Sequence, residues 1–466
     1  MRALIRIGAV AIAGVTLYYA GIVNSNVILR PSPSGAVVVV AAVAAALAML
    51  VVALRGTGAG EALAAPRPRL VGPLRFVWLL VSVMALVGLA WLTGLPVTRT
   101  LDWTPYHNDA IALNHCAAEL LLDGRDPYRD LDLFDCYRRL GIGPDRTTPV
   151  RRGLFAEESV YPDDLLMDRV WELRSRGPRE ENVEFVWRPS YPSLSFVLVV
   201  PWVLTGWDPN LLYTLCLIAA MALVVLRAPP GTRPFVLTAL LGAASLSAFT
   251  VSGSADLLYA LPLVAAWLWR ERVWGALALG IAISVKQLAW FYVPFYAMQV
   301  AAAEGWPAAL RKTGLAAAVF AAANLPFVLW DAEAWLLGVL TPVVEPMFPR
   351  GAGIVFLSAN AVLPLFPAYA YLALEAAAAL AALVVAWRLR HSSPELGAVL
   401  PLLPLFFGWR SLFSYFFLLP LFALAGVARM PLGALDPARA RASGGITLLA
   451  MPRPAASGPR AAPGRS

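Results

Sequence analysis

Long apolar runs dominate this chain, and they constrain its fold more than any other feature. A helix needs about 20 apolar residues to cross a bilayer. Of the 466 residues, 59% are hydrophobic and only 14% are charged, whereas soluble domains carry about 25% charged residues. The sequence therefore predicts an all-α, polytopic transmembrane protein with about 11–13 membrane helices. The expected apolar elements are 7–23, 36–54, 74–97, 191–206, 209–226, 234–251, 255–269, 273–300, 314–330, 353–366, 367–387 and 396–428, of which 273–300 and 396–428 are long enough for two pieces each.

A polar segment from Arg99 to Arg188 interrupts this apolar pattern. It holds 18 of the 29 acidic residues and 13 of the 37 basic residues, and all 13 are arginines. Apolar runs border it on both sides, so it is predicted to be a long external loop bearing interfacial helices. The chain then divides into N-terminal membrane helices over 1–97, the polar loop over 98–190, a membrane helix bundle over 191–429 and a disordered tail over 430–466, which is rich in Pro, Ala, Gly and Arg.

Basic residues set the expected orientation. Arg55, Arg67, Arg69 and Arg75 precede the third apolar run, and the positive-inside bias places them on the cytoplasmic face. The polar loop then lies on the non-cytoplasmic side of a multi-pass protein in the cell membrane. The net charge of +8 follows from the same bias, because the basic residues lie mostly at span ends, and it does not indicate nucleic-acid binding.

A strict count of spans conflicts with this bias at Arg270-Glu271-Arg272. Counting from an external loop puts the cluster outside, whereas the charge bias puts it inside. One segment between 191 and 251 that is re-entrant, or that lies in the membrane plane, would remove the conflict. At the N-terminus, Arg2 and Arg6 precede an apolar run without a small-x-small cleavage site, which favours a retained helix over a signal peptide.

Asp109 stands where the polar loop begins. The sequence from Asp109 to Leu122 predicts a short helix with a broad apolar face, capped by Asp109 or Asn108 and lying on the membrane surface. Asp123-Gly124 ends it. Asp109 has two interpretations. It caps the helix, or it is a shielded carboxylate that accepts a proton from an incoming hydroxyl.

Lys286 is an ionisable residue in an otherwise apolar helix, and the chain has only one other lysine, Lys312. A charge at membrane depth is by default a functional-site hypothesis, with snorkelling to the interface as the alternative. Arg410 interrupts the last apolar stretch in the same way, as a phosphate ligand or as a loop cation. Asp256 begins another span, where it caps a helix or contacts a substrate. Arg188, at the end of the polar loop, is also at a depth suited to a lipid phosphate.

The acidic pairs and the cysteines leave their alternatives open. Glu157-Glu158 and Asp163-Asp164 have the chemistry of a divalent-metal site, although pairs of this kind are usually solvated surface. No metal is required. Cys116 and Cys136 both lie in the polar loop, where a disulfide suits an oxidising compartment and two free thiols are the alternative.

The order of these features resembles the polytopic GT-C glycosyltransferases, and most closely the polyprenyl-phosphomannose-dependent mannosyltransferases of glycosyltransferase family 87. The matching residues are Asp109, Ala117-Ala118, Leu121, Gly124, Pro127-Tyr128, the stretch from Trp187 to Pro192 and Lys286, within roughly residues 75–430. The family usually has its Asp soon after the first span, whereas here two spans come before the one that leads to Asp109, and the loop over 129–184 is longer than expected.

The resemblance implies a GT-C-like fold and transfer of a sugar, mannose by analogy, from a polyprenyl-phosphate donor to a hydroxyl of a lipid or glycan acceptor. Asp109 would be the general base of an inverting reaction. The donor phosphate is expected at Lys286, Arg410 and Arg188. Substrate contacts are expected at Asn108, His107, Tyr128, Gln287 and Asp256. Neither a cofactor nor a nucleic acid is expected, and the other partners are membrane lipids.

Two other functions remain open. A secondary transporter or lipid flippase would explain the spans and Lys286, but such proteins often show two related halves, which this sequence does not display. A non-catalytic scaffold whose polar loop binds a partner protein is the second.

Overall fold

The computed structural model describes residues 2–56, 79–84, 87, 106, 109–178, 181–246 and 254–430. Within them the chain is mainly helical, and its two strands, β1 (Arg350–Gly351) and β2 (Arg410–Ser411), form one short parallel pair. The all-α prediction is therefore confirmed for the described part of the chain. Most of the predicted span 74–97 and nearly all of the predicted tail fall outside it, as do His107 and Asn108.

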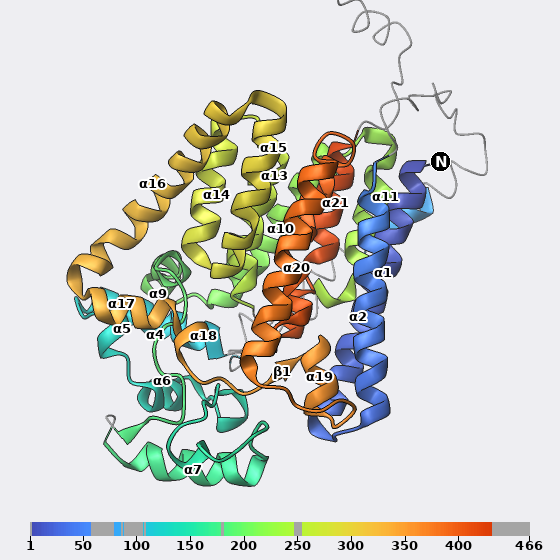
Figure 1. Cartoon of the computed structure of the whole chain (residues 1–466). Helices are drawn as coiled ribbons and strands as arrows, with labels where there is room; N and C mark the ends of the chain where they lie inside the picture. The colour runs from blue at the N-terminus through green and yellow to red at the C-terminus, as the bar shows by residue number, and fades with distance from the viewer. Residues whose placement is uncertain are drawn as a thin grey trace, which may run out of the picture.

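An apolar helical bundle forms the larger part of the molecule (Figure 1). By length and composition, five described helices can cross a membrane, which indicates a membrane protein. They are α1 (Arg2–Leu29), α2 (Pro33–Leu54), α10 (Pro209–Arg227), α16 (Trp306–Trp330) and α20 (Ala368–Leu389). The bundle also contains α11 (Arg233–Gly242), α13 (Asp256–Leu268), α14 (Val273–Val285), α15 (Tyr292–Glu304), α19 (Ile354–Ala359) and α21 (Leu419–Arg429).

The five spans are fewer than the expected 11–13, because several apolar runs do not form one long helix. The run 273–300 forms α14 and α15 with a short 3-10 helix, η5 (Gln287–Phe291), between them, which fits the predicted two pieces. The run 396–428 consists of proline-containing 3-10 turns followed by α21. Proline removes an amide donor and clashes with the preceding helical turn, so such runs break.

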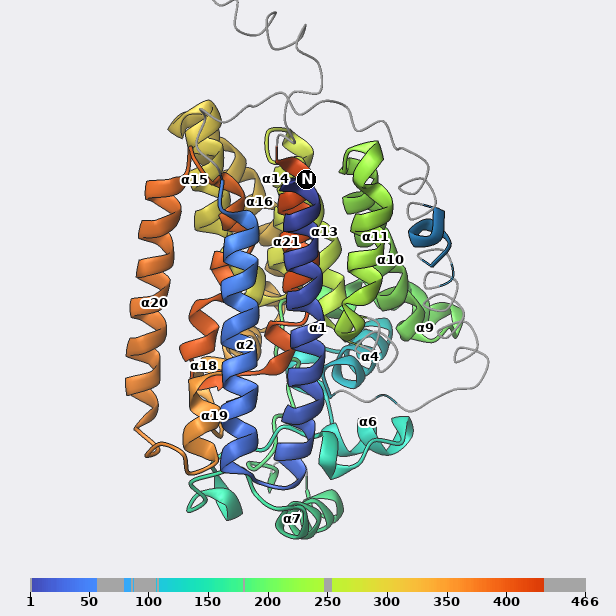
Figure 2. The same cartoon turned by 90° about the vertical axis from the view of Figure 1, so that its right-hand side faces the viewer.

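The run 191–206 explains the conflict over Arg270-Glu271-Arg272. It forms two short helices, α8 (Leu194–Val197) and α9 (Val200–Thr205). Both pack against α4 (Asp109–Leu122) instead of crossing the bundle (Figure 2). The next long helix, α10, therefore leads away from the polar loop. As a result, Arg270 lies at the end of the bundle opposite to the polar loop.

Buried ion pairs join the helix ends on that far side. Glu395 accepts hydrogen bonds from Arg270 at 2.7 and 3.0 Å and from the Trp267 indole at 2.8 Å. Arg429 pairs with Glu271, and Lys312 donates to Glu304 at 2.7 Å and to the carbonyl of Glu271 at 2.6 Å. Lys312 is thus a buried, fully engaged cation rather than an ordinary charge at a span end.

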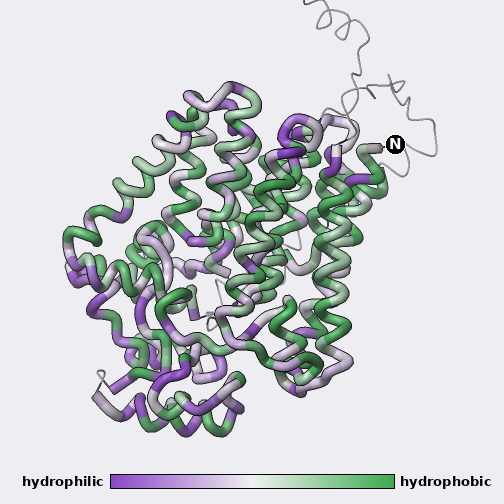
Figure 3. The backbone as a smooth tube through the Cα atoms, viewed as in Figure 1, coloured by the Kyte–Doolittle hydropathy of each residue, from purple (hydrophilic) through white to green (hydrophobic). Residues whose placement is uncertain are grey.

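The polar loop forms a compact lobe at the other end, and hydrophilic residues are concentrated there (Figures 1 and 3). Its helices are α4, α5 (Pro127–Asp130), α6 (Leu133–Leu140) and α7 (Asp164–Arg176), and α17 (Ala332–Val339) and α18 (Thr341–Val344) lie beside it. Rings of Phe134, Trp171 and Phe185 meet edge to face in its core.

Glu184 anchors the lobe from inside. Its side chain is fully buried and accepts two hydrogen bonds from Arg174, at 2.7 and 2.8 Å, and one from the amide of Leu154. Burial alone would raise the pKa of Glu184, but the Arg174 and backbone donors outweigh it and hold that pKa below its ordinary value. The lobe is therefore a folded unit and not a solvated loop.

Candidate functional site

A cavity of about 1090 Å³ lies where the lobe meets the helical bundle. Its walls come from α4, from loop residues 148–151 and 186–191, from the helix ends around residues 255 and 286, from 339–347, from α20 and from 401–415. These segments are distant in sequence, so the cavity exists only in the folded chain. The charged residues in its wall are Asp109, Arg151, Asp256, Lys286, Glu345, Glu375 and Arg410.

Asp109 is the first residue of α4, and the predicted helix from Asp109 to Leu122 is confirmed residue for residue. Its Oδ1 accepts a hydrogen bond from the Ala110 amide at 2.7 Å, and its Oδ2 accepts one from the Thr148 hydroxyl at 2.5 Å. The helix does not present an exposed apolar face, since every residue from Ala110 to Ala118 is buried. Asp109 is therefore held by protein on both oxygens and faces the cavity from a rigid helix.

Lys286 lies at a break between α14 and η5, where its backbone is extended. Its ammonium group forms a buried ion pair with Asp256, the first residue of α13, and lies 4.8 Å from the centre of the Tyr191 ring. The Ser254 hydroxyl donates to the second oxygen of Asp256 at 3.2 Å. Lys286 and Asp256, predicted separately, are thus one unit, and Lys286 reaches the cavity with a counter-ion already bound.

Arg410 is half-buried at the cavity wall in β2, opposite Arg350 of β1. Its Nη1 is buried and has no hydrogen-bond partner among the described residues. Arg410 is therefore a cation of the cavity with unused hydrogen-bonding capacity.

Three of the predicted site residues are not placed for direct contact with a substrate, namely Gln287, Tyr128 and Arg188. Gln287 lines the cavity, but its amide donates to the carbonyls of Ser190 and Val339, at 2.7 and 2.6 Å. Tyr128 is fully buried outside the cavity wall and donates to the carbonyl of Tyr191 at 2.8 Å. Both side chains therefore hold the backbone around Tyr191 in place.

Arg188 stacks on its neighbour Trp187, with its Cζ atom 4.4 Å from the ring centre, and it is not among the residues that line the cavity. His107 and Asn108, also expected at the substrate, lie outside the described residues. Of the predicted cations, the structure brings Lys286 and Arg410 to the cavity with Asp109.

Sequence reasoning missed Thr148, Arg151 and Glu375. Thr148 and Arg151 lie in a charged loop where nothing local distinguishes Arg151 from Arg152. They reach the cavity because residues 149 and 150 pair with Phe185 and Met347. Glu375 is an acid within the long apolar helix α20, and the rule that singled out Lys286 would also have found it.

An apolar groove continues from the cavity along the bundle. A second cavity of about 530 Å³ lies between α15, α16 and α20 and shares Pro294 and Leu383 with the first. Trp306 and Trp387 stack at its far part, with ring centres 6.0 Å apart, and both are exposed. The two cavities together place charged groups at one end of a long apolar path that is open at the protein surface.

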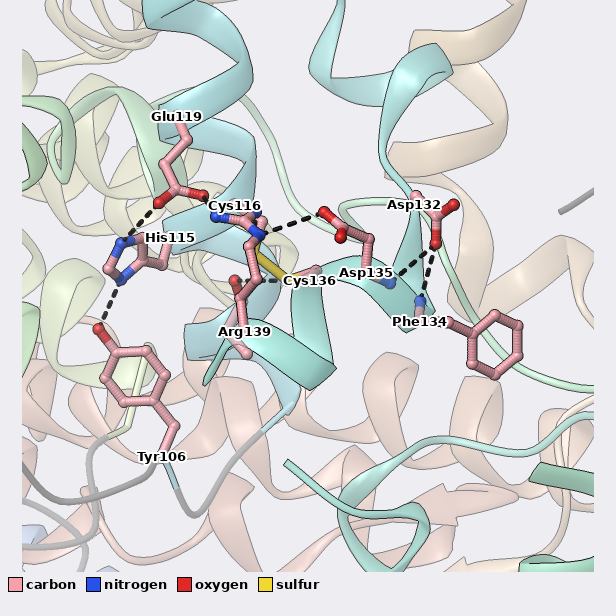
Figure 4. The surroundings of a disulfide bond; sticks show 10 residues. Tyr106, His115, Cys116, Glu119, Asp132, Phe134, Asp135, Cys136 and Arg139 are labelled. Carbon is pink, nitrogen blue, oxygen red and sulfur yellow. Dashed lines mark hydrogen bonds and ion pairs between the residues drawn. A yellow bond between two sulfur atoms is a disulfide. The ribbon is translucent and has the colours of Figure 1, made fainter. Parts of the chain in front are cut away.

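A disulfide between Cys116 and Cys136 ties α4, which carries Asp109, to α6 (Figure 4). The structure therefore decides between the two cysteine alternatives. Beside the disulfide, Glu119 accepts a hydrogen bond from Arg139 at 2.8 Å and lies 3.4 Å from His115 (Figure 4). Burial would raise the pKa of Glu119, but its hydrogen bonds with His115 and Arg139 outweigh this, and the pKa lies below its ordinary value.

Among the residues that the structure describes, the acidic pairs of the lobe belong to no group of three or more His, Cys, Asp or Glu residues placed to hold a metal ion. Asp163 instead caps α7, accepting a hydrogen bond from the amide of Leu166 at 2.8 Å.

No protein-family model, curated protein or solved structure matches this chain.

Proposed function

We propose that the chain is a membrane glycosyltransferase that moves a sugar from a polyprenyl-phosphate donor to a hydroxyl of a lipid or glycan acceptor. The observation that carries the proposal is the composition of one cavity. Its wall holds four carboxylates, including Asp109 on the lobe side, and three cations, of which Lys286 and Arg410 are the predicted ones. An apolar groove leads away from it between α15 and α20. An amphiphile with an anionic head and a long apolar tail fits cations at the end of an apolar groove.

The chemistry is a single displacement with inversion. Asp109 accepts the proton of the acceptor hydroxyl while the hydroxyl oxygen forms a bond to the anomeric carbon. The bond between that carbon and the phosphate oxygen breaks, and its electron pair leaves with the lipid phosphate. Fixed cations near the developing charge lower the barrier. Lys286 and Arg410 take this role, and Arg188 does not, because it lies outside the cavity wall.

The disulfide supports the proposed side of the reaction. Disulfides persist in oxidising compartments and are rare in the cytosol, and Cys116–Cys136 belongs to the lobe. The basic residues Arg270 and Arg429 lie at the opposite end, where the positive-inside bias expects cytoplasm. Both observations favour a lobe, and hence an active site, on the non-cytoplasmic face of the cell membrane. Mannose remains the sugar that the resemblance to family 87 implies.

The test uses the purified full-length protein in lipid nanodiscs, with polyprenyl-phosphomannose and a membrane-lipid extract as the source of acceptor. Asp109→Asn should abolish sugar transfer while the melting temperature stays near that of the wild type. Asp145→Asn is the matched control, since Asp145 is an exposed carboxylate of the same lobe that does not line the cavity. Wild-type transfer by Asp109→Asn would rule out the base assignment.

The Asp256–Lys286 pair favours a second candidate, a secondary transporter or lipid flippase. Buried charges within membrane helices often mark transport pathways, and this pair lines the cavity. In that case Lys286→Met should stop lipid translocation across reconstituted vesicles, and Asp109→Asn should leave translocation intact.

A further inference from the structure

Three arginines from distant parts of the chain lie on neighbouring extended segments, and two of them, Arg151 and Arg410, line the cavity. Val150 pairs with Met347, and the amide of Arg151 donates to the carbonyl of Pro346 at 2.9 Å. A few residues later on the same segment, Arg350 lies directly opposite Arg410 in the parallel pair of β1 and β2. We call Arg151, Arg350 and Arg410 the arginine cluster.

No carboxylate pairs with any member of this cluster among the residues that the structure describes. Glu345, on the segment that leads to Arg350, lies 3.1 Å from Arg152 instead. The Nε atom of Arg151 and the Nη1 atom of Arg410 are buried without a hydrogen-bond partner. Buried donors without partners are costly, and like charges directly opposite on adjacent strands are unfavourable.

Aromatic packing relieves only part of this imbalance. The guanidinium carbon of Arg350 lies 4.1 Å from the centre of the Tyr161 ring, a cation–π contact that leaves its positive charge in place. Guanidinium groups without a carboxylate partner fit an anion, and their paired N–H donors match the oxygens of a phosphate group in particular.

Arg350 and Lys286 contact different aromatic rings. Lys286 contacts Tyr191 and carries its own counter-ion, Asp256, whereas Arg350 lies over the Tyr161 ring. Arg151 and Arg410 line the same cavity as Asp109 and Lys286. Asp109 therefore shares the cavity wall with two cationic positions, one at Lys286 and one at the arginine cluster.

We infer that the arginine cluster binds a phosphate group carried by the acceptor, while Lys286 faces the phosphate of the donor and Arg410, which lines the same cavity, serves both phosphates. This rests on the proposed function and deepens it, because it assigns the acceptor to the class of phosphorylated lipids or glycans. The acceptor phosphate would fix the position of the acceptor, so that one of its hydroxyl groups comes within reach of Asp109.

The experiment measures melting of the purified full-length protein with inorganic phosphate as the probe. Phosphate replaces chloride at constant ionic strength, with and without saturating polyprenyl phosphate. If the cluster is a second anion site, phosphate raises the melting temperature in both conditions. Loss of the phosphate effect when polyprenyl phosphate is present, or no effect in either condition, overturns the proposal. Absence or loss of the shift in the wild type is decisive even if a variant fails to fold, whereas a shift that is present is assigned by the variants, because phosphate also stabilises proteins without a specific site.

Variants assign the effect to residues. Arg350→Gln and Arg151→Gln should each remove most of the phosphate-dependent shift, and Arg152→Gln, whose exposed side chain already pairs with Glu345, should keep it. A full shift in both cluster variants overturns the assignment. If polyprenyl phosphate itself causes no shift but the cluster still responds to phosphate, the anion site stands and the glycosyltransferase proposal falls.

Discussion

The hydroxyl of Thr148 donates a hydrogen bond of 2.5 Å to Oδ2 of Asp109, across 39 residues of sequence. The backbone of Thr148 is fixed in turn, because its carbonyl accepts from the amide of Val186 at 2.9 Å. The backbone pairing of Thr148 with Val186 therefore sets the orientation of Asp109, the proposed base. Thr148 is the positioning residue of that carboxylate.

Thr148→Val should lower kcat for sugar transfer by about tenfold or more, because a hydrogen bond to a charged group contributes about 1.5–3 kcal/mol. The KM for the donor should change little. Thr148→Ser keeps the hydroxyl and should restore most of the rate. Equal kcat loss in the valine and serine variants would show that the methyl packing of Thr148 matters instead of its hydrogen bond.

Removing one partner of the Asp256–Lys286 pair should destabilise the fold strongly. Lys286→Met leaves Asp256 buried without its cation, which costs about 3–5 kcal/mol. The double variant Asp256→Asn with Lys286→Met should recover much of the melting temperature but not the binding of polyprenyl phosphate. Recovery of both would mean that the pair is only structural. The half-exposed Arg152–Glu345 pair is the control, with an expected cost of about 0–1 kcal/mol.

Acid should weaken the lobe through Glu184. Its folded pKa is lower than its ordinary value, so its contribution is fully present above the unfolded pKa of about 4.3 and is lost as the pH falls through the folded pKa. Glu184→Gln should lower the melting temperature at pH 7. The gap to the wild type should narrow as the pH is reduced from about 5 toward 3. A gap that stays constant with pH would contradict the charged interaction with Arg174.

Loss of the disulfide should destabilise the lobe without removing the site chemistry. Cys116 and Cys136 are 20 residues apart, and closing a loop of this size stabilises by about 3 kcal/mol. The double variant Cys116→Ala with Cys136→Ala should melt at a lower temperature and still transfer sugar when assayed well below that temperature. An unchanged melting temperature would show that the packing of α4 on α6 is sufficient.

The parts of the fold that follow local rules could be predicted from the sequence. The helix from Asp109 to Leu122 is followed two residues later by Gly124, which adopts a positive φ of 70° that glycine tolerates after a helix end. The conflict at Arg270 predicted that a segment between 191 and 251 would not cross, and α8 and α9 are that segment.

The pairings that build the site could not be predicted, because they join distant segments. Asp256 and Lys286 were each conspicuous as a charge in an apolar run, but nothing in either run indicates that α13 and α14 bring them into contact. Thr148 and Arg151 were hidden for a related reason. Their roles depend on backbone pairing with residues 185–186 and 346–347, and no local pattern encodes that pairing.

The groove between α15 and α20 has a kinetic consequence. Since its apolar wall is open at the surface beside α16 and α20, two helices long enough to cross a membrane, the proposed lipid donor would reach Lys286 sideways, without leaving the bilayer. The quantity that sets the rate is then the mole fraction of donor among the surrounding lipids, and not its concentration in the sample. Diluting the donor with inert lipid should slow the reaction even when the total amounts of enzyme and donor are unchanged.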